Sequence, residues 1–174
     1  MSKNQTTYAP QLPWENRWQQ PDINTLVNQL EPPRSETFQN FMNGLRQWEQ
    51  LEENMIWAGD GWKWTAEFNL AGHKGHATGP DNPDAFAYVV CDPRPEPVRP
   101  MLAIPLSNEL IAHVPFRRLN RYIRDGIKSA KLSVDIVWGV WSPGANTEVE
   151  HLLDLCKRKI RFLTGDAKLK PNKD

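Results

Sequence analysis

The chain has 174 residues, of which 39% are hydrophobic and 24% charged, as is usual for one globular domain. Its formal net charge is zero, but residues 1–87 carry 6 basic and 11 acidic side chains and residues 88–174 carry 15 basic and 10 acidic ones. Two cysteines are too few for a disulfide framework, and the chain has neither a signal-peptide pattern nor an apolar run of about 18–20 residues. We therefore expect a cytoplasmic protein without a membrane span.

Residues 1–34 are rich in Gln, Asn and Pro and show no sustained hydrophobic period. This composition predicts an extended or disordered N-terminal arm, unless Trp14 and Trp18 tether it to the domain surface or bind a partner. After Ser35, apolar residues recur every three or four positions, which predicts an amphipathic helix over 35–53.

Five strands are expected over 55–58, 62–70, 86–91, 101–106 and 132–141. Residues 62–70 alternate apolar and polar side chains almost without exception, and a tight turn at 59–61 joins this strand to the one before it. Such alternation is typical of a sheet with one polar face, which is usually antiparallel.

Three further helices are expected after the fourth strand. They cover 107–113, 115–131 with Pro115 as its first residue, and a last helix that begins at Asn146 or Thr147 and ends before Gly165. The fold class is therefore α+β, with a five-stranded, mainly antiparallel sheet and helices packed mostly on one face. We expect one domain over 35–164 and a C-terminal tail over 165–174.

A family resemblance rests on the Trp-rich hairpin IWAGDGWKWTAEF, the strands FAYVVC and MLAIPL, the segment VDIVWGVW and the ending LLDLCKRKI. Over residues 36–163 the chain resembles small bacterial proteins known only as a domain of unknown function, similar in pattern to the YdhG-like superfamily. The arm and the basic helix 115–131 depart from that pattern. The resemblance implies a fold and no active-site residue.

Catalytic motifs are absent from the sequence. His73 and His76 form an HxxH pair near Asp81 and Asp84, but a glycine-rich loop lacks the helical register that aligns two metal ligands, so we expect no metal. The chain has no phosphate-binding glycine loop and no nucleophile elbow, so we expect no cofactor. An enzyme remains possible in principle, since acid and base residues from distant positions leave no local signature.

A basic stripe is the clearest pattern in the second half of the chain. Its members step by 4, 3, 4 and 3 positions, which on one helix stacks them opposite the apolar side: Arg117, Arg121, Arg124, Lys128 and Lys131. Like charges at this spacing repel one another, and an anion would relieve the repulsion. The first hypothesis is a non-enzymatic binding or adaptor module that contacts an anionic macromolecule, either nucleic acid or an acidic protein. The alternative is a solvated face that the acidic first half neutralises.

A second hypothesis is a small-molecule pocket, with or without catalysis, between sheet and helices. Its aromatic lining would be Trp62, Trp64, Tyr88, Trp138 and Trp141. A deep pocket with convergent polar groups would favour this hypothesis, whereas a filled core below a flat basic face would favour the first. The sequence indicates no ligand identity and no oligomeric state.

Overall fold

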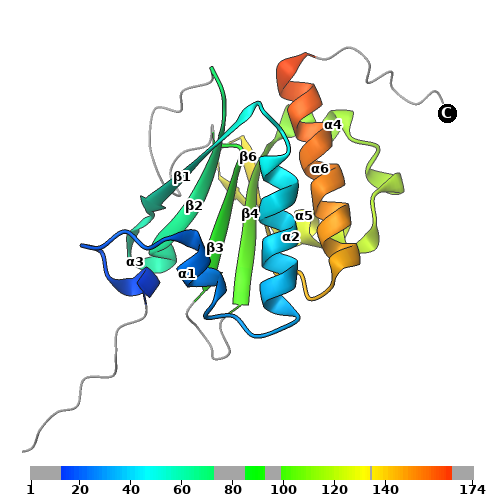
Figure 1. The fold of residues 1–174 in the computed structure, drawn as a ribbon. Helices are drawn as coiled ribbons and strands as arrows, with labels where there is room; N and C mark the ends of the chain where they lie inside the picture. Colours follow the sequence, from blue (N-terminus) through cyan, green and yellow to red (C-terminus); the bar gives the residue numbers. More distant parts are fainter. Residues whose placement is uncertain (1–12, 73–84, 93–98, 134, 166–174) are drawn as a thin grey trace, which may run out of the picture.

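The structure is a computed structural model that describes residues 13–72, 85–92, 99–133 and 135–165 (Figure 1). Its six strands are β1 (Leu51–Trp57), β2 (Trp64–Leu70), β3 (Ala87–Asp92), β4 (Arg99–Ser107), β5 (Lys131–Ser133) and β6 (Ile136–Trp141). They form one open sheet in the order β1-β2-β3-β4-β6-β5, and every neighbouring pair is antiparallel. The α+β class and the antiparallel sheet are thereby confirmed.

The sheet has six strands instead of the five expected, because residues 132–141 contain a hairpin. Lys131 pairs with Trp138 and Ser133 with Ile136, and Asp135 lies in the turn between the two strands. Apolar residues at even positions run through the turn without a break, so the sequence pattern hid the reversal, although Leu132 pairs with Val137 and therefore leaves the face opposite to Trp138.

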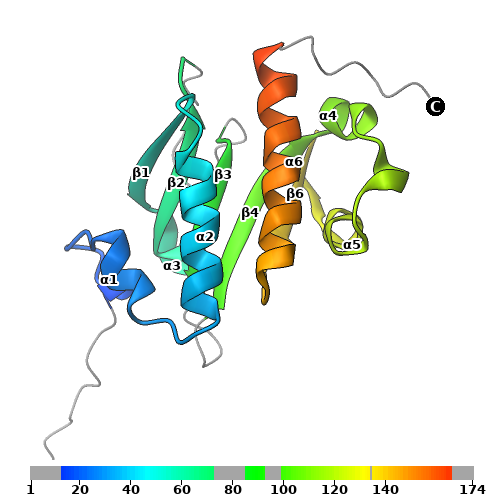
Figure 2. The same ribbon diagram turned by 45° about the vertical axis from the view of Figure 1, so that its right-hand side comes forward.

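The helical elements are η1 (Pro13–Glu15), α1 (Ile23–Val27), α2 (Arg34–Arg46), α3 (Gly59–Trp62), α4 (Asn108–His113), η2 (Phe116–Arg118), α5 (Arg121–Ser129) and α6 (Asn146–Thr164). Helices α2 and α6 lie side by side across one face of the sheet, as both views show (Figures 1 and 2). Helix α5 packs beside β6. Helix α6 ends as expected at Gly165, whose φ of 65° is the left-handed conformation that glycine adopts readily.

Two expected helices were too long. The helix predicted over 35–53 ends at Arg46, and Leu51 already begins β1, where Leu51 fits the strand period as well as the helix period. The helix predicted over 115–131 is interrupted after Arg118, because Asn120 is extended and its side chain accepts a hydrogen bond from Tyr122 N as the N-cap of α5.

The main core lies between the sheet and the helices α2 and α6. Side chains that alternate along β2 and β4, among them Phe68, Leu102 and Ile104, meet Phe41 of α2 and Leu152 of α6 there. The opposite face of the sheet carries a second, smaller buried cluster: Ala85, Tyr88, Val90 and Ala103. The two faces therefore have separate environments.

Part of the expected N-terminal arm packs on the sheet. Trp14 is fully buried in the main core, Glu15 pairs with Lys63 at 3.0 Å, and the indole nitrogen of Trp64 donates to the carbonyl of Asn16 at 2.7 Å. Trp18, four positions after Trp14, is 89% exposed. Of the two expected tethers, Trp14 holds this segment in place.

None of the helices in the described part of the chain is long and apolar enough to cross a membrane.

Candidate functional site

The five aromatic residues expected in one pocket lie on two faces of the sheet. Trp64 and Trp141 belong to the main core below the helices, and the Trp141 indole donates to the carbonyl of Tyr122 at 3.3 Å. Trp62, Tyr88 and Trp138 lie with the second cluster on the opposite face. The five side chains therefore line no common pocket between sheet and helices.

Local backbone geometry explains the separation of Trp62 from Trp64. In a continuous strand, residues two apart share a face, but Trp62 ends the short helix α3. Lys63 between them has φ 56° and ψ −137°, so the chain changes direction before β2 begins. Trp138 and Trp141 are three apart on β6 and so point to opposite faces.

Trp62, Tyr88 and Trp138 form an aromatic cluster with their rings in direct contact. The ring centroids lie 5.4 Å apart for Trp62–Tyr88, 6.2 Å for Trp62–Trp138 and 6.0 Å for Tyr88–Trp138. The Tyr88 hydroxyl donates to the buried carboxylate of Glu67 at 3.1 Å, and the side-chain amide of Asn69 donates to the other oxygen of Glu67 at 3.0 Å. These bonds fix Tyr88 beneath the two indoles.

A groove of about 580 Å³ opens beside this aromatic cluster. Its lining comes from α3, the end of α5, β5 and β6, and consists of Trp62, Gly126, Ser129, Ala130, Lys131, Leu132, Trp138 and Val140. Two of these residues have exposed apolar side chains: Val140, 43% exposed, shares a face of β6 with Trp138, whereas Leu132, 65% exposed, pairs with Val137 and leaves the other face. The volume falls within the range usual for ligand pockets, about 300–1,000 Å³.

Polar groups in the groove are few. The Ser129 hydroxyl donates to the carbonyl of Gly126 at 3.2 Å, within α5. Lys131 is directly opposite Trp138 in the β5–β6 pair, so both side chains leave the same face of the sheet. The groove is thus mostly apolar, with one ammonium group at its edge.

The predicted basic stripe is divided among three elements. Arg121, Arg124 and Lys128 lie on α5, whereas Arg117 belongs to η2 and Lys131 to β5. The stripe breaks because Asn120 starts a new helix and the chain becomes extended at Ala130, whose ψ is 148°. Arg117, Arg121, Lys128 and Lys131 are exposed and Arg124 is half-buried.

Two members of the stripe interact with nearby side chains. Arg121 pairs with Asp125 at 3.3 Å, with both side chains largely exposed, and the Lys128 ammonium lies 6.0 Å from the centre of the Phe116 ring. Lys131 is the member that reaches the groove. The structure thus joins one residue of the predicted basic stripe to two residues of the predicted aromatic pocket.

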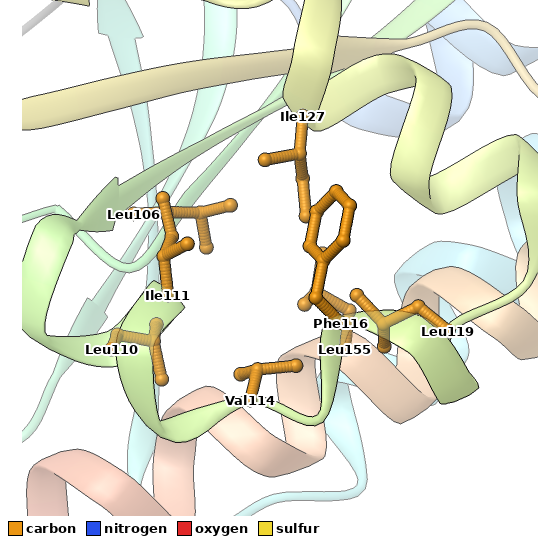
Figure 3. Close-up of a pocket in the computed structure, with 8 residues that line it drawn as sticks. All are labelled: Leu106, Leu110, Ile111, Val114, Phe116, Leu119, Ile127 and Leu155. Atoms are coloured by element: carbon orange, nitrogen blue, oxygen red, sulfur yellow. The ribbon is translucent and has the colours of Figure 1, made fainter.

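A second cavity lies under the segment that joins β4 to α5 (Figure 3). Apolar side chains surround it on all sides: Leu106, Leu110, Ile111, Val114, Phe116, Leu119, Ile127 and Leu155. Its volume is about 10 Å³, close to the minimum for one water molecule, and its lining offers almost no polar partner. We regard it as a small packing defect in the core.

Lys159 of α6 is a cation buried in the core. Its ammonium donates to the carbonyls of Phe86 at 2.7 Å, Pro105 at 2.6 Å and Ala85 at 3.3 Å, and burial lowers the pKa of Lys159 to about 7. A sequence signal existed, because position 159 follows Cys156 by three and Leu152 by seven, on the apolar side of α6.

The expected absence of a metal rests on residues outside the described ranges, since His73, His76, Asp81 and Asp84 all lie there. Within the described residues, no group of three or more His, Cys, Asp or Glu side chains could hold a metal ion. Cys156 is fully buried, and burial raises the pKa of its thiol to about 12, so it is not a reactive nucleophile.

No family model, curated protein or solved structure matches this chain.

Proposed function

We propose that this domain binds a small organic molecule in the groove beside Trp62 and Trp138. The observation that carries the proposal is the exposure of Val140, which shares a face of β6 with Trp138, next to two indoles in one concave site. Exposed apolar surface is unfavourable in water at about 25 cal/mol per Å², and a ligand that covers these side chains recovers that free energy. This is the small-molecule hypothesis from the sequence, moved to the opposite face of the sheet.

The site is also rigid before any ligand arrives. Tyr88 is fully buried, stacks on Trp138 at an interplanar angle of 29° and is hydrogen-bonded to Glu67. Rings that are already ordered lose little conformational entropy when a ligand packs on them, which favours affinity. We propose binding without catalysis, since the groove lining carries one cation and no general acid–base pair among the described residues.

A thermal-shift screen of a small-molecule library, followed by titration of tryptophan fluorescence, tests the proposal. We expect compounds that raise the Tm of the wild-type protein and lose affinity in Trp138→Ala and Val140→Glu. Val140 is exposed and shares a face of β6 with Trp138, so its replacement by Glu places a charge beside the indoles with little effect on stability. Trp18→Ala is the matched control, because Trp18 is exposed and lies outside the groove lining. Compounds that bind Val140→Glu as tightly as wild type would refute this site.

A second candidate function is the contact with an anionic macromolecule that the sequence indicated. The exposure of Arg117, Arg121 and Lys128, in a half of the chain with a net charge of +5, supports it. If the partner is nucleic acid, we expect retention on a DNA or heparin column at low salt that falls steeply as salt rises. The double variant Arg121→Glu with Lys128→Glu should elute earlier than wild type, and elution unchanged from wild type would reject this surface.

We also propose a relation to the YdhG-like proteins and a cytoplasmic location. The YdhG-like resemblance rests on strand and helix order, and the cytoplasmic location rests on low cysteine usage and on the free, buried Cys156.

A further inference from the structure

We infer that the ligand of the groove is a flat aromatic molecule that carries a negatively charged group. This inference rests on the proposed function and adds the chemical class of the ligand. Its basis is the contact between the aromatic rings, the angle between Trp62 and Trp138, and the position of Lys131.

The contacts among the rings exclude a cationic ligand held between aromatic faces. Such a cage needs open space between its rings, with the cation within about 6 Å of each centroid. Here the centroids of Trp62, Tyr88 and Trp138 are themselves 5.4 to 6.2 Å apart, the spacing of rings in contact. The cluster therefore offers the groove only the outer surfaces of Trp62 and Trp138.

The two indoles form a corner suited to a flat ring. Their planes meet at 70°, so a planar molecule can stack on one indole while its edge meets the face of the other. Offset stacking and edge-to-face contacts are the two arrangements that aromatic pairs prefer, and both are more favourable than burial of the same area alone. The aliphatic side chain of Val140, on the same face of β6 as Trp138, completes the apolar surface.

The charge at the groove is positive. Lys131 is the one charged residue among the described residues that line it, and no carboxylate within the described ranges forms an ion pair with Lys131. The nearby C-terminal end of α5 contributes about half a negative charge, which is smaller than the full charge of the ammonium. An anionic substituent next to the stacked ring would meet Lys131, directly opposite Trp138.

Three probes of similar size separate the contributions of charge and planarity. They are 2-naphthoate, the 2-naphthylmethylammonium ion and decahydronaphthalene-2-carboxylate, titrated against the full chain by tryptophan fluorescence and calorimetry. We expect naphthoate to bind more tightly than either of the others by about fivefold or more, the size of a partly exposed charge pair.

Lys131→Glu should abolish the preference for naphthoate and favour the ammonium probe instead. Lys128→Glu is the matched control, since it makes the same charge change three positions away on α5, where Lys128 faces Phe116 and not the groove. It should leave the order of the three affinities unchanged.

Two results would overturn the inference and leave the proposed function intact. In one, the ammonium probe binds wild type as tightly as naphthoate, and Lys131→Glu changes neither affinity. In the other, none of the three probes binds, while library compounds of different chemistry bind and depend on Val140. Failure of every library compound and every probe would remove both the ligand class and the groove as a binding site.

Discussion

At the scale of single residues, Lys159 shows how a buried charge can replace a missing backbone hydrogen bond. Pro105 lies in the inner strand β4, between β3 and β6, and carries no N–H to donate. The Lys159 ammonium has three N–H donors and places them on three carbonyls at this point of the sheet. Lys159 therefore joins α6 to the strands β3 and β4.

Replacement of Lys159 by Met should lower the free energy of unfolding by about 2–4 kcal/mol, because buried carbonyls lose their donors while the shape of the side chain is kept. Chemical denaturation measures this. Lys157→Met is the control, since Lys157 is exposed on the same helix, and a change within about 0.5 kcal/mol is expected there. Equal stability of Lys159→Met and wild type would show that the three hydrogen bonds contribute nothing net.

The difference in the free energy of unfolding between wild type and Lys159→Met should depend on pH. Burial lowers the pKa of Lys159 from 10.5 to about 7, so between these values the unfolded chain binds more protons than the folded one. Under that condition the free energy of unfolding rises with pH. We expect the stability of wild type relative to Lys159→Met to increase from pH 7 to 9. A constant difference would mean that the three carbonyls favour the ammonium as strongly as burial opposes it.

At the scale of elements, glycines allow two close approaches between packed segments. A side chain at Gly126 would overlap the indole of Trp141, so the absence of one lets α5 lie against β6, and a side chain at Gly44 of α2 would meet Leu153 of α6. The position of α5 also shapes the groove, because its end supplies Gly126, Ser129 and Ala130 to the lining.

We expect Gly126→Ala to destabilise the protein by about 1–3 kcal/mol through overpacking, although alanine favours a helix over glycine by about 1 kcal/mol. Thermal or chemical denaturation measures the effect. Gly61→Ala is the control, since Gly61 lies in the short helix α3 and the methyl group of an alanine there would have no atom within 4 Å. If Gly126→Ala is instead more stable than wild type, α5 has room to move away from β6.

The sequence predicted elements well where one periodicity stands alone. Strand β2 and helix α6 are examples, since alternation marks the first, and capping residues and Gly165 mark the second. Prediction was wrong where one residue fits two patterns, as Leu51 fits both helix 35–53 and β1. The five cations do not share one helix face. Asn120 caps the start of a new helix inside the segment that the longer pattern predicted to be one helix.

The groove was only partly predictable for a similar reason. Trp62 and Trp138 were both expected in a pocket, and Lys131 was expected at a binding surface. Their meeting depends on the bend at Lys63 and on the hairpin that pairs Lys131 with Trp138, neither of which follows from side-chain periodicity. The backbone conformation at a few single positions therefore determines which residues line the groove.

At the scale of the whole molecule, the segment before α2 is part of the main core. Leu26, Val27 and Leu30 are buried with Trp14, at the edge of the sheet where β1 and β2 lie. The acidic first half and the basic second half of the chain thus share one folded body.

Trp14→Ala should lower the free energy of unfolding by about 3–5 kcal/mol, as is usual for removal of a large buried aromatic ring. Trp18→Ala, four positions later, should change it by less than about 0.5 kcal/mol, because that ring is exposed. Denaturation curves of the two variants measure the contrast. Equal effects would show that the segment before α2 detaches from the sheet in solution.

The hydrogen bonds of Lys159 also bear on the order of folding. They join residues that are 54 to 74 positions apart in the chain, so the centre of the sheet acquires its last donors only when the C-terminal helix has docked. Contacts between such distant residues slow folding, because a long loop must close before they form. We therefore expect strands β3 and β4 and helix α6 to form late and to open together as one cooperative unit.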